Sequence, residues 1–171
     1  KEYGISARLT FSNSLLREEH ILDKKCNALC KLFEEAGDIQ RERVSDSNMQ
    51  NKSIKDIQEN NVQPKAIQNG VIVHADLLLD YLKKNYSNLY FVSSTTKVLI
   101  NFQAFLKEVK REDFQYVVPD FRLNKSFDRL NTLTQIEKDK VEFLCNECCW
   151  FGCKDRKRCY ETVSRKNLGE N

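Results

Sequence analysis

Residues 71–97, with the sequence VIVHADLLLDYLKKNYSNLYFVSSTTK, decide the fold of this chain. Two apolar runs of strand length, Val71–His74 and Leu89–Val92, are rich in β-branched and aromatic residues. Neither run alternates with polar residues, which is typical of strands buried on both faces of a parallel sheet. Between them, Asp76 can cap a helix whose leucines share one face. A strand, a helix and a strand in this order predict a parallel βαβ unit.

The rest of the chain repeats this alternation. Three further runs have strand composition, namely residues 7–11, 116–118 and 141–144. A helix is predicted from Asn13 or Ser14 to about Ala36, where Gly37 supplies a C-cap, and another over residues 102–109. We therefore expect an α/β fold of about five parallel βα units. It is either an incomplete TIM-barrel-like arrangement or a small open parallel sheet.

The length and composition fit one domain. The chain has 171 residues, of which 40% are hydrophobic and 31% charged, and this excludes full disorder. A complete eight-fold β/α barrel needs roughly 200 residues or more. Residues 38–69 are rich in Asn, Gln, Lys, Asp and Ser, so we expect a polar, mobile insertion there with a short helix near 54–59. The prediction is one α/β domain over 1–171 with this insertion and a cysteine-rich basic C-terminal segment at 145–166.

The sequence also bears on the compartment. No run approaches the ~18 apolar residues of a membrane span, so no membrane association is expected. The first residues lack a basic region followed by an apolar run, which a secretory signal would show. Seven cysteines are an odd number for a disulfide framework. These observations favour a reducing, cytoplasmic setting.

Polar residues follow the end of every predicted strand, where parallel α/β sheets place their ligand sites. The same residue types are common helix caps, so each one alone is a weak signal. Together they predict a polar pocket for an unknown small-molecule or peptide substrate. Asp120 and Glu147 are the candidates for acid or base catalysis. The expected binding residues are Asn13, Asp76, Asn124, Asn146 and Arg156.

Five of the seven cysteines fall between residues 145 and 159. Thiolates are soft anionic ligands for zinc and for iron–sulfur clusters, and the spacings Cys149-x3-Cys153 and Cys153-x5-Cys159 suit a shared metal. An iron–sulfur cluster or zinc is therefore the expected cofactor. A disulfide within the cluster and free buried thiols are the alternative interpretations. The predicted metal ligands are Cys148, Cys149, Cys153 and Cys159.

Structural roles are expected for the other cysteines and for His74, whereas a general base or ligand role is the alternative for His74. Cys145 follows a predicted strand and is expected to be a small buried residue, and Cys26 and Cys30 are expected in the core on one helix face. His74 ends a strand and is interpreted as structural. No GxGxxG, GxxxxGK[ST] or HExxH motif occurs, so dinucleotide-binding, P-loop and zincin functions have no support.

The positive charge of the chain is concentrated near its end. Residues 154–166 hold six basic and two acidic residues, whereas the whole chain has a net charge of +3. Trp150 and Phe151 lie just before them, a combination found in nucleic-acid-binding segments. The alternative to a metalloprotein is thus a non-catalytic nucleic-acid-binding or interaction domain with a zinc-knuckle-like or disulfide-bonded end. The expected contacts are Lys154, Arg156, Lys157 and Arg158.

Residues 146–160, NECCWFGCKDRKRCY, resemble the cysteine-rich stretch of the peptidase U32 (collagenase-like) family. In that family a Cys-x3-Cys-Arg-x2-Tyr type of motif follows a barrel strand. The spacing differs here because Arg156 does not directly follow Cys153. The resemblance implies a β/α-barrel relative whose cysteines bind an iron–sulfur cluster, and a link to peptide hydrolysis or RNA modification. It covers this stretch alone and leaves open whether the chain is an enzyme.

Overall fold

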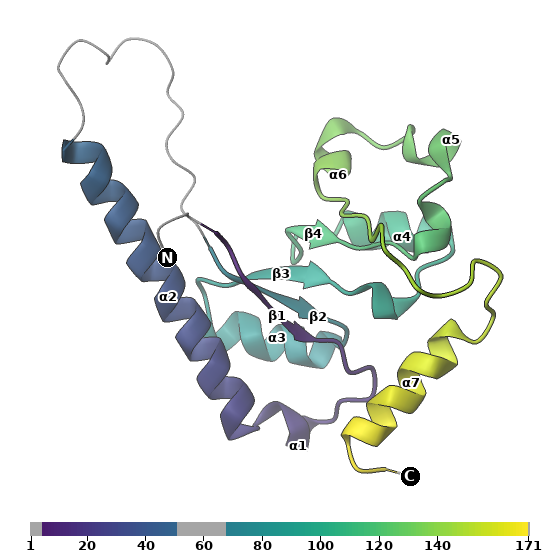
Figure 1. Cartoon of the computed structure of the whole chain (residues 1–171), viewed down its shortest axis with the longest axis horizontal. Coiled ribbons are helices and arrows are strands. Elements are labelled where there is room, and N and C mark those ends of the chain that lie inside the picture. The colour runs from purple at the N-terminus through teal and green to yellow at the C-terminus, as the bar shows by residue number, and fades with distance from the viewer. Residues whose placement is uncertain (1–4, 51–67, 171) are drawn as a thin grey trace.

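The structure, a computed structural model, describes residues 5–50 and 68–170, with residues 38–50 described by their backbone alone. Its centre is a sheet of four parallel strands in the order β1-β2-β3-β4 (Figure 1). The sheet does not close into a barrel. Of the two arrangements expected from the sequence, the structure therefore has the small open parallel sheet. The strands are β1 (Arg8–Phe11), β2 (Gly70–Val73), β3 (Tyr90–Ser93) and β4 (Tyr116–Val117).

Helices connect and flank the strands. As the sequence predicts, α3 (Asp76–Asn85) joins β2 to β3, and α4 (Phe102–Val109) joins β3 to β4. No helix in the described parts of the chain is long and apolar enough to cross a bilayer. The other helices are α1 (Glu18–Ile21), α2 (Lys24–Gln50), α5 (Phe127–Leu130), α6 (Gln135–Asp139), α7 (Arg156–Asn167) and the short 3₁₀ turns η1 (Thr95–Lys97) and η2 (Phe121–Leu123).

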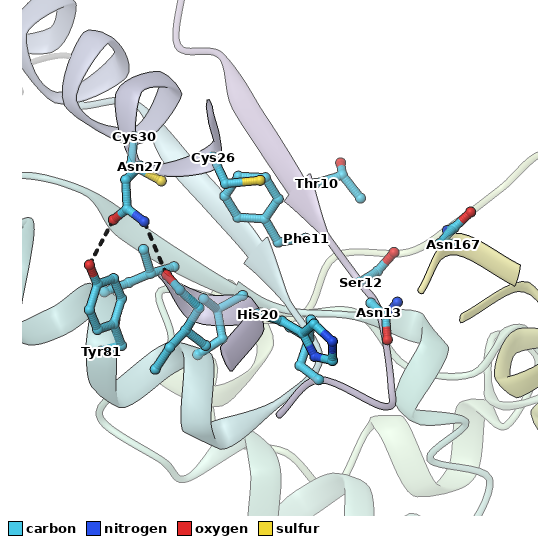
Figure 2. A pocket seen from close by; sticks show the side chains of 14 residues that line it. Thr10, Phe11, Ser12, Asn13, His20, Cys26, Asn27, Cys30, Tyr81 and Asn167 are labelled. Carbon is cyan, nitrogen blue, oxygen red and sulfur yellow. Dashed lines mark hydrogen bonds between the residues drawn. The ribbon is translucent and has the colours of Figure 1, made fainter. Parts of the chain in front are cut away.

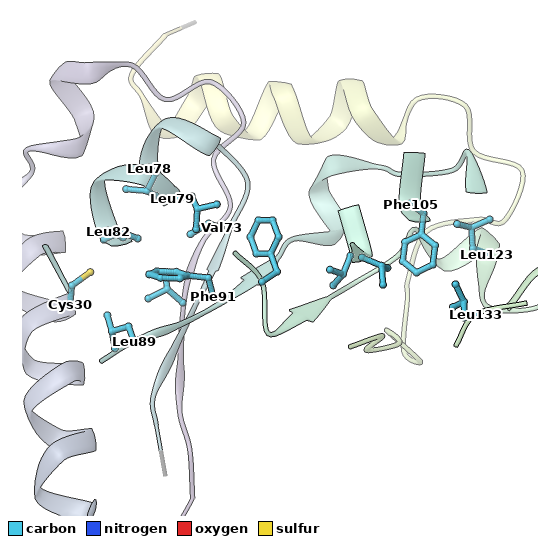
Figure 3. Close-up of a cluster of buried hydrophobic side chains, with 14 of the residues drawn as sticks. Cys30, Val73, Leu78, Leu79, Leu82, Leu89, Phe91, Phe105, Leu123 and Leu133 are labelled. Atoms are coloured by element: carbon cyan, nitrogen blue, oxygen red, sulfur yellow. The ribbon is translucent and has the colours of Figure 1, made fainter. Parts of the chain in front are cut away.

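One face of the sheet is apolar and covered by helices. Val71 pairs with Phe91 in register, and Val73 lies two residues further along β2, so all three side chains point to the same face. Cys30 of α2 closes one end of this core (Figure 3). The buried side chains that α3 and α4 add are Leu78, Leu79, Leu82, Phe102, Phe105 and Val109.

The opposite face carries a polar cluster. The guanidinium of Arg8 lies 5.4 Å from the ring centre of Tyr90 and 5.0 Å from that of Tyr116. The same group donates to both carboxylate oxygens of Glu142, at 2.7 and 2.6 Å. One nitrogen, Nη1, makes both contacts, while Nε donates to the hydroxyl of Tyr90 at 2.8 Å, and together these contacts fix the position of Arg8 on this face. It also ties β1 to the segment that follows β4.

The predicted start of the first helix is wrong. Asn13 and Ser14 lie in the loop after β1 and contact α7 instead of capping a helix. The cap of α2 is Asp23, whose carboxylate accepts the backbone N–H of Cys26 at 2.8 Å. This hydrogen bond is the main cause of a pKa of Asp23 below its usual range.

The predicted end of this helix is also wrong. Gly37 does not terminate it, because α2 continues to Gln50. A single glycine costs a helix interior about 1 kcal/mol, which the good helix formers around it can offset. The first part of the predicted insertion, residues 38–50, is therefore helical. The short helix expected near 54–59 lies outside the described residues.

The fifth predicted strand, residues 141–144, is reduced to one bridge between Val141 and Val117. The side chain of Glu142 turns to Arg8, and the chain then leaves the sheet as an irregular segment. Cys145, expected to be buried in this strand, is exposed. Four strands and a bridge thus replace the five strands expected.

Candidate functional site

A pocket of about 260 Å³ opens at the carboxyl end of β1 (Figure 2). Its walls come from the end of β1, the loop after it, α1, the start of α2 and α3, and the last residue of α7 contributes at one side. The apolar lining residues are Phe11, Leu16, Ile21, Leu78 and Leu82. The polar ones are Thr10, Ser12, Asn13, His20, Asn27, Tyr81 and Asn167, with the thiols of Cys26 and Cys30.

The lining of this pocket is uncharged. None of its described residues is Asp, Glu, Lys or Arg, although almost a third of the chain is charged. Burial raises the pKa of Cys30 to about 11, and burial together with Asp23 raises the pKa of Cys26. Both thiols are therefore protonated and neutral at pH 7. Such a lining suits an uncharged molecule with an apolar body and a polar end, because a charged ligand would lose its hydration without gaining a partner.

Asn27 fixes the inner wall of the pocket. Its amide nitrogen donates to the carbonyl oxygens of Ile21 and Asp23, at 3.0 and 2.8 Å. Its side-chain oxygen accepts the hydroxyls of Tyr81 and Tyr86, both at 2.8 Å. All four hydrogen-bonding sites of the amide are thus occupied. The amide holds α1, α2 and α3 in fixed relation, so the wall is preformed.

Two hydroxyls and one imidazole lie at the rim of the pocket. Within the described parts of the chain, the hydroxyls of Thr10 and Ser12 have no hydrogen-bond partner. Nδ1 of His20 accepts the backbone N–H of Arg17 at 3.0 Å, so the hydrogen of the neutral ring is on Nε2. His20 can donate this hydrogen, although Nε2 also lies 3.8 Å from a carboxylate oxygen of Glu19, and the hydroxyls can donate or accept. The rim can therefore recognise a hydroxyl, carbonyl or amide group.

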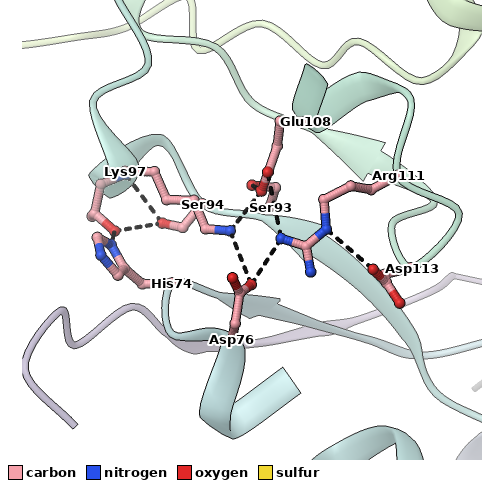
Figure 4. A network of polar contacts seen from close by, with 9 residues as sticks. His74, Asp76, Ser93, Ser94, Lys97, Glu108, Arg111 and Asp113 are labelled. Atoms are coloured by element: carbon pink, nitrogen blue, oxygen red, sulfur yellow. Dashed lines mark hydrogen bonds and ion pairs between the residues drawn. The ribbon is translucent and has the colours of Figure 1, made fainter. Parts of the chain in front are cut away.

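A second polar region lies at the ends of β2 and β3, and its charges neutralise one another (Figure 4). Lys97 Nζ contacts a carboxylate oxygen of Glu108 at 2.5 Å and one of Asp76 at 3.7 Å. Arg111 donates to the same Asp76 at 2.8 Å. Asp76, expected to bind substrate, instead pairs with both cations. Burial would raise the pKa of Asp76, but the contacts with Arg111 and Lys97 outweigh it, and the pKa lies below its usual range.

The electrostatics of this region are those of a stable internal network. Burial would raise the pKa of Glu108, but the hydrogen bonds from Lys97 and Ser93 outweigh it, and the pKa lies below the usual range. Burial first, and then the nearby charge of Lys97, lowers the pKa of His74. His74 is therefore neutral at pH 7, and its Nδ1 lies 2.8 Å from the hydroxyl of Thr96. The structural interpretation of His74 agrees with these contacts.

A buried ion cluster lies at the end of β4. Asp120 is fully buried, and its two oxygens accept Nε and Nη2 of Arg122 at 2.6 and 3.0 Å. Nε of Arg156, which is 3% exposed, lies 3.2 Å from the same carboxylate. Nη2 of Arg156 contacts Glu147 at 2.5 Å, and this contact is the main cause of a lowered pKa of Glu147. Both carboxylates are thus engaged by guanidinium groups. The catalytic role expected for Asp120 and Glu147 stays a prediction.

This cluster and two loop contacts attach α7 to the sheet. Arg156 begins α7, and its guanidinium lies 4.8 and 5.0 Å from the ring centres of Phe121 and Tyr160. Further along α7, Ser164 accepts the N–H of Ser14 at 3.0 Å, and its carbonyl accepts the amide of Asn13 at 3.1 Å. Asn13 and Arg156, both expected to bind substrate, thus hold α7, although Asn13 also reaches the pocket.

The predicted metal ligands are not brought together. Cys149 and Cys153 are partly exposed, whereas Cys148 and Cys159 are exposed. Across the described residues, no group of three or more His, Cys, Asp or Glu side chains is arranged to hold a metal ion. Binding of zinc or an iron–sulfur cluster stays a prediction.

The remaining predicted binding residues lie apart from the pocket. Asn124 donates its amide hydrogen to the carbonyl of Leu144 at 3.0 Å, and its side-chain oxygen is buried with no partner among the described residues. Asn146 is exposed in the segment before α7. The polar pocket residues that the sequence did not single out include Thr10, His20, Asn27, Tyr81 and Asn167.

The fold and the pocket define an open, all-parallel α/β protein with a preformed, uncharged cavity at one strand end. No protein-family model, curated protein or solved structure matches this chain. The resemblance to the U32 family therefore stays a prediction based on the cysteine motif alone.

Proposed function

We propose that this protein binds a small, uncharged molecule with an apolar body and one polar end in the pocket at the carboxyl end of β1. The observation that carries the proposal is the lining, which combines an apolar floor with a polar rim and has no charged residue among those described. A volume of about 260 Å³ suits a single-ring compound. The free hydroxyls of Thr10 and Ser12 and the Nε2–H of His20 supply the polar recognition.

The test uses 4-fluorophenol, a neutral ring with one hydroxyl, and follows its ¹⁹F NMR signal on titration with the protein. We expect saturable binding with a Kd on the order of 1 mM, as is usual for a ligand of so few atoms. The charged analogue 4-fluorobenzoate should bind at least about tenfold more weakly, because its carboxylate would be desolvated without a partner.

Two variants on one helix localise the binding. Cys26→Phe places a ring in the pocket from α2 and should abolish binding. Ala28→Phe adds the same ring at an exposed position of α2 that does not line the pocket, and should leave binding unchanged. Equal binding by both variants, or tighter binding of the benzoate, would contradict the proposal.

A second candidate function is nucleic-acid binding through α7. Five basic side chains, Lys154, Lys157, Arg158, Arg165 and Lys166, are exposed, and none forms an ion pair within the described parts of the chain. Trp150 and Phe151 are exposed beside the start of this helix. Arg156, expected to contribute, is buried in the ion cluster and is not available. Unpaired cations beside exposed rings support binding of single strands.

This candidate is tested with a fluorescein-labelled oligouridine at several salt concentrations. The double variant Lys157→Gln/Arg158→Gln should reduce affinity and lower the slope of log K against log salt by about 1 to 2. Lys24→Gln/Lys25→Gln, which removes two exposed charges from the start of α2, is the matched control and should leave the slope unchanged. No binding at low salt would exclude this candidate.

A further inference from the structure

The outer side of α2 exposes two leucines to solvent. This helix lies at the edge of the molecule (Figure 1), and Cys30 on its inner side is 1% exposed and points into the core (Figure 3). Leu29 and Leu32, one and two residues from Cys30, are 43% and 58% exposed. Covering both leucines would be favourable, because apolar surface would leave water.

The exposed leucines belong to a regular strip along the helix. Lys25, Leu29, Leu32 and Ala36 follow one another at spacings of four, three and four residues. Alternating spacings of four and three keep side chains on one strip of a helix and are typical of a helix that pairs with another. Lys25 is exposed like the leucines, and the small, partly exposed Ala36 permits close approach of a second helix.

The charges beside the strip indicate which helix fits it. Lys25 precedes the leucines and Glu35 follows them, and both side chains are exposed. Glu35 is held only loosely within the helix, since its carboxylate lies 3.8 Å from the ammonium group of Lys31 in solvent. A second copy of α2 that runs antiparallel places Lys25 of each copy beside Glu35 of the other. A parallel copy would place each charge beside its own like, so charge complementarity favours the antiparallel arrangement.

We propose that two copies of this chain associate through α2, with their helices antiparallel and related by a two-fold axis. Leu29 of each copy packs against Leu32 of the other. The apolar stem of Lys25 covers Ala36 of the second copy, and its ammonium group reaches Glu35. The surface of α2 is thus complementary to itself, and the proposal is independent of the pocket at β1.

The proposed contact is short. The helices overlap over residues 24–37, which span about 20 Å at ~1.5 Å per residue. Such a contact belongs to the small, weak class of interfaces, so we expect a Kd on the order of 100 µM.

Sedimentation equilibrium of the parent chain between about 10 µM and 1 mM tests the proposal. The average mass should rise with concentration towards twice that of the chain. Leu32→Glu places a carboxylate against Leu29 of the second copy and should weaken association at least about tenfold. Ile136→Glu, the matched control, changes a side chain on α6 that is 78% exposed, and should associate like the parent.

Charge variants test the antiparallel direction. Lys25→Glu and Glu35→Lys should each weaken association about tenfold, because each puts like charges side by side twice in the dimer. An equimolar mixture of the two variants should associate like the parent, since each mixed pair has opposite charges at both contacts. Lys24→Glu alters an exposed neighbour that does not belong to the strip, and should have no effect.

Three results would overturn the proposal. The parent could keep the mass of one chain up to about 1 mM, Leu32→Glu could associate as well as the parent, or the mixed charge variants could associate no better than either one alone. Circular dichroism checks the fold of Leu32→Glu. The mixing experiment changes only exposed charged side chains, so it decides the matter even if that variant is misfolded.

Discussion

Replacing Arg156 by methionine removes the cation that joins α7 to the end of β4 while keeping a long side chain in its place. Arg156 is 3% exposed and lies between the carboxylates of Asp120 and Glu147. Removing one partner of a buried ion pair typically costs about 3–5 kcal/mol. Asp120 keeps both contacts to Arg122 in the variant, so the loss falls mainly on Glu147. We therefore expect the lower end of that range.

The ring contacts change this estimate little. Arg156 lies over Phe121 and Tyr160, contacts worth about 0.5–1 kcal/mol each, and a methionine sulfur interacts with rings to a similar extent. The expected loss in the free energy of unfolding is thus about 3 kcal/mol. For a chain of this length it corresponds to a decrease in Tm of about 6–12 °C.

Urea denaturation followed by circular dichroism at pH 7 measures the effect. Arg158→Met on the same helix, at an exposed position, is the matched control and should change stability by less than about 0.5 kcal/mol. The double variant Glu147→Gln/Arg156→Met should recover part of the loss, because the unpaired carboxylate is then neutral. A change below about 1 kcal/mol for Arg156→Met, or no recovery in the double variant, would refute the assignment of a buried ion cluster.

The pH dependence gives a sign that can be checked. Arg156 lowers the pKa of Glu147 in the folded state, so the stabilisation from Glu147 is complete above its ordinary pKa and is lost as the pH falls through the lowered value. Arg156→Met lacks this contribution. The difference in stability between parent and variant should therefore shrink on acidification below about pH 4. A difference that grows would contradict the ion pair.

The other predictions concern the sheet and its two polar regions. Glu108→Gln leaves Lys97 with a weaker partner and should cost about 1.5–3 kcal/mol at pH 7, and the cost should decrease in acid because the pKa of Glu108 is lowered in the folded state. Arg8→Lys has a single side-chain nitrogen and cannot keep the contacts to Glu142 and to the Tyr90 hydroxyl together, so thermal unfolding should show a loss of about 1–2 kcal/mol, while an unchanged Tm would contradict this role. Leu79→Ala, at a fully buried position of α3, should cost about 2–5 kcal/mol in urea denaturation, and a smaller cost would place α3 outside the core.

The βαβ unit could be predicted because residues 71–97 encode it locally. The strand composition of two short runs and the leucines of α3 all favour the same arrangement, and the structure agrees to within a residue at each strand. The ends of α2 could not be predicted in this way. Glycine is a typical C-cap residue and has a low helix propensity, so Gly37 predicts the end of a helix. The polar composition after Gly37 does not reveal that α2 continues to Gln50.

The site was harder to predict for a physical reason. Polar residues at strand ends suggested one pocket, but Asp76 pairs with Arg111, and Asp120 pairs with Arg156 in addition to the neighbouring Arg122. The pairs with Arg111 and Arg156 depend on tertiary contacts that no local pattern encodes. His20 belongs to a helix of four residues among charged neighbours, and nothing in its surroundings indicated a pocket. Only the position of the pocket, at the carboxyl edge of a parallel sheet, follows a general rule.

The most direct test of the account is a backbone NMR titration of the parent chain with 4-fluorophenol. We expect the shift changes to concentrate at residues 10–16, 20–30 and 78–82, which surround the pocket, and 4-fluorobenzoate to produce at most weak changes there. Shift changes confined to α7 and residues 149–153, or scattered over the surface without saturation, would contradict the assignment of the pocket as the binding site.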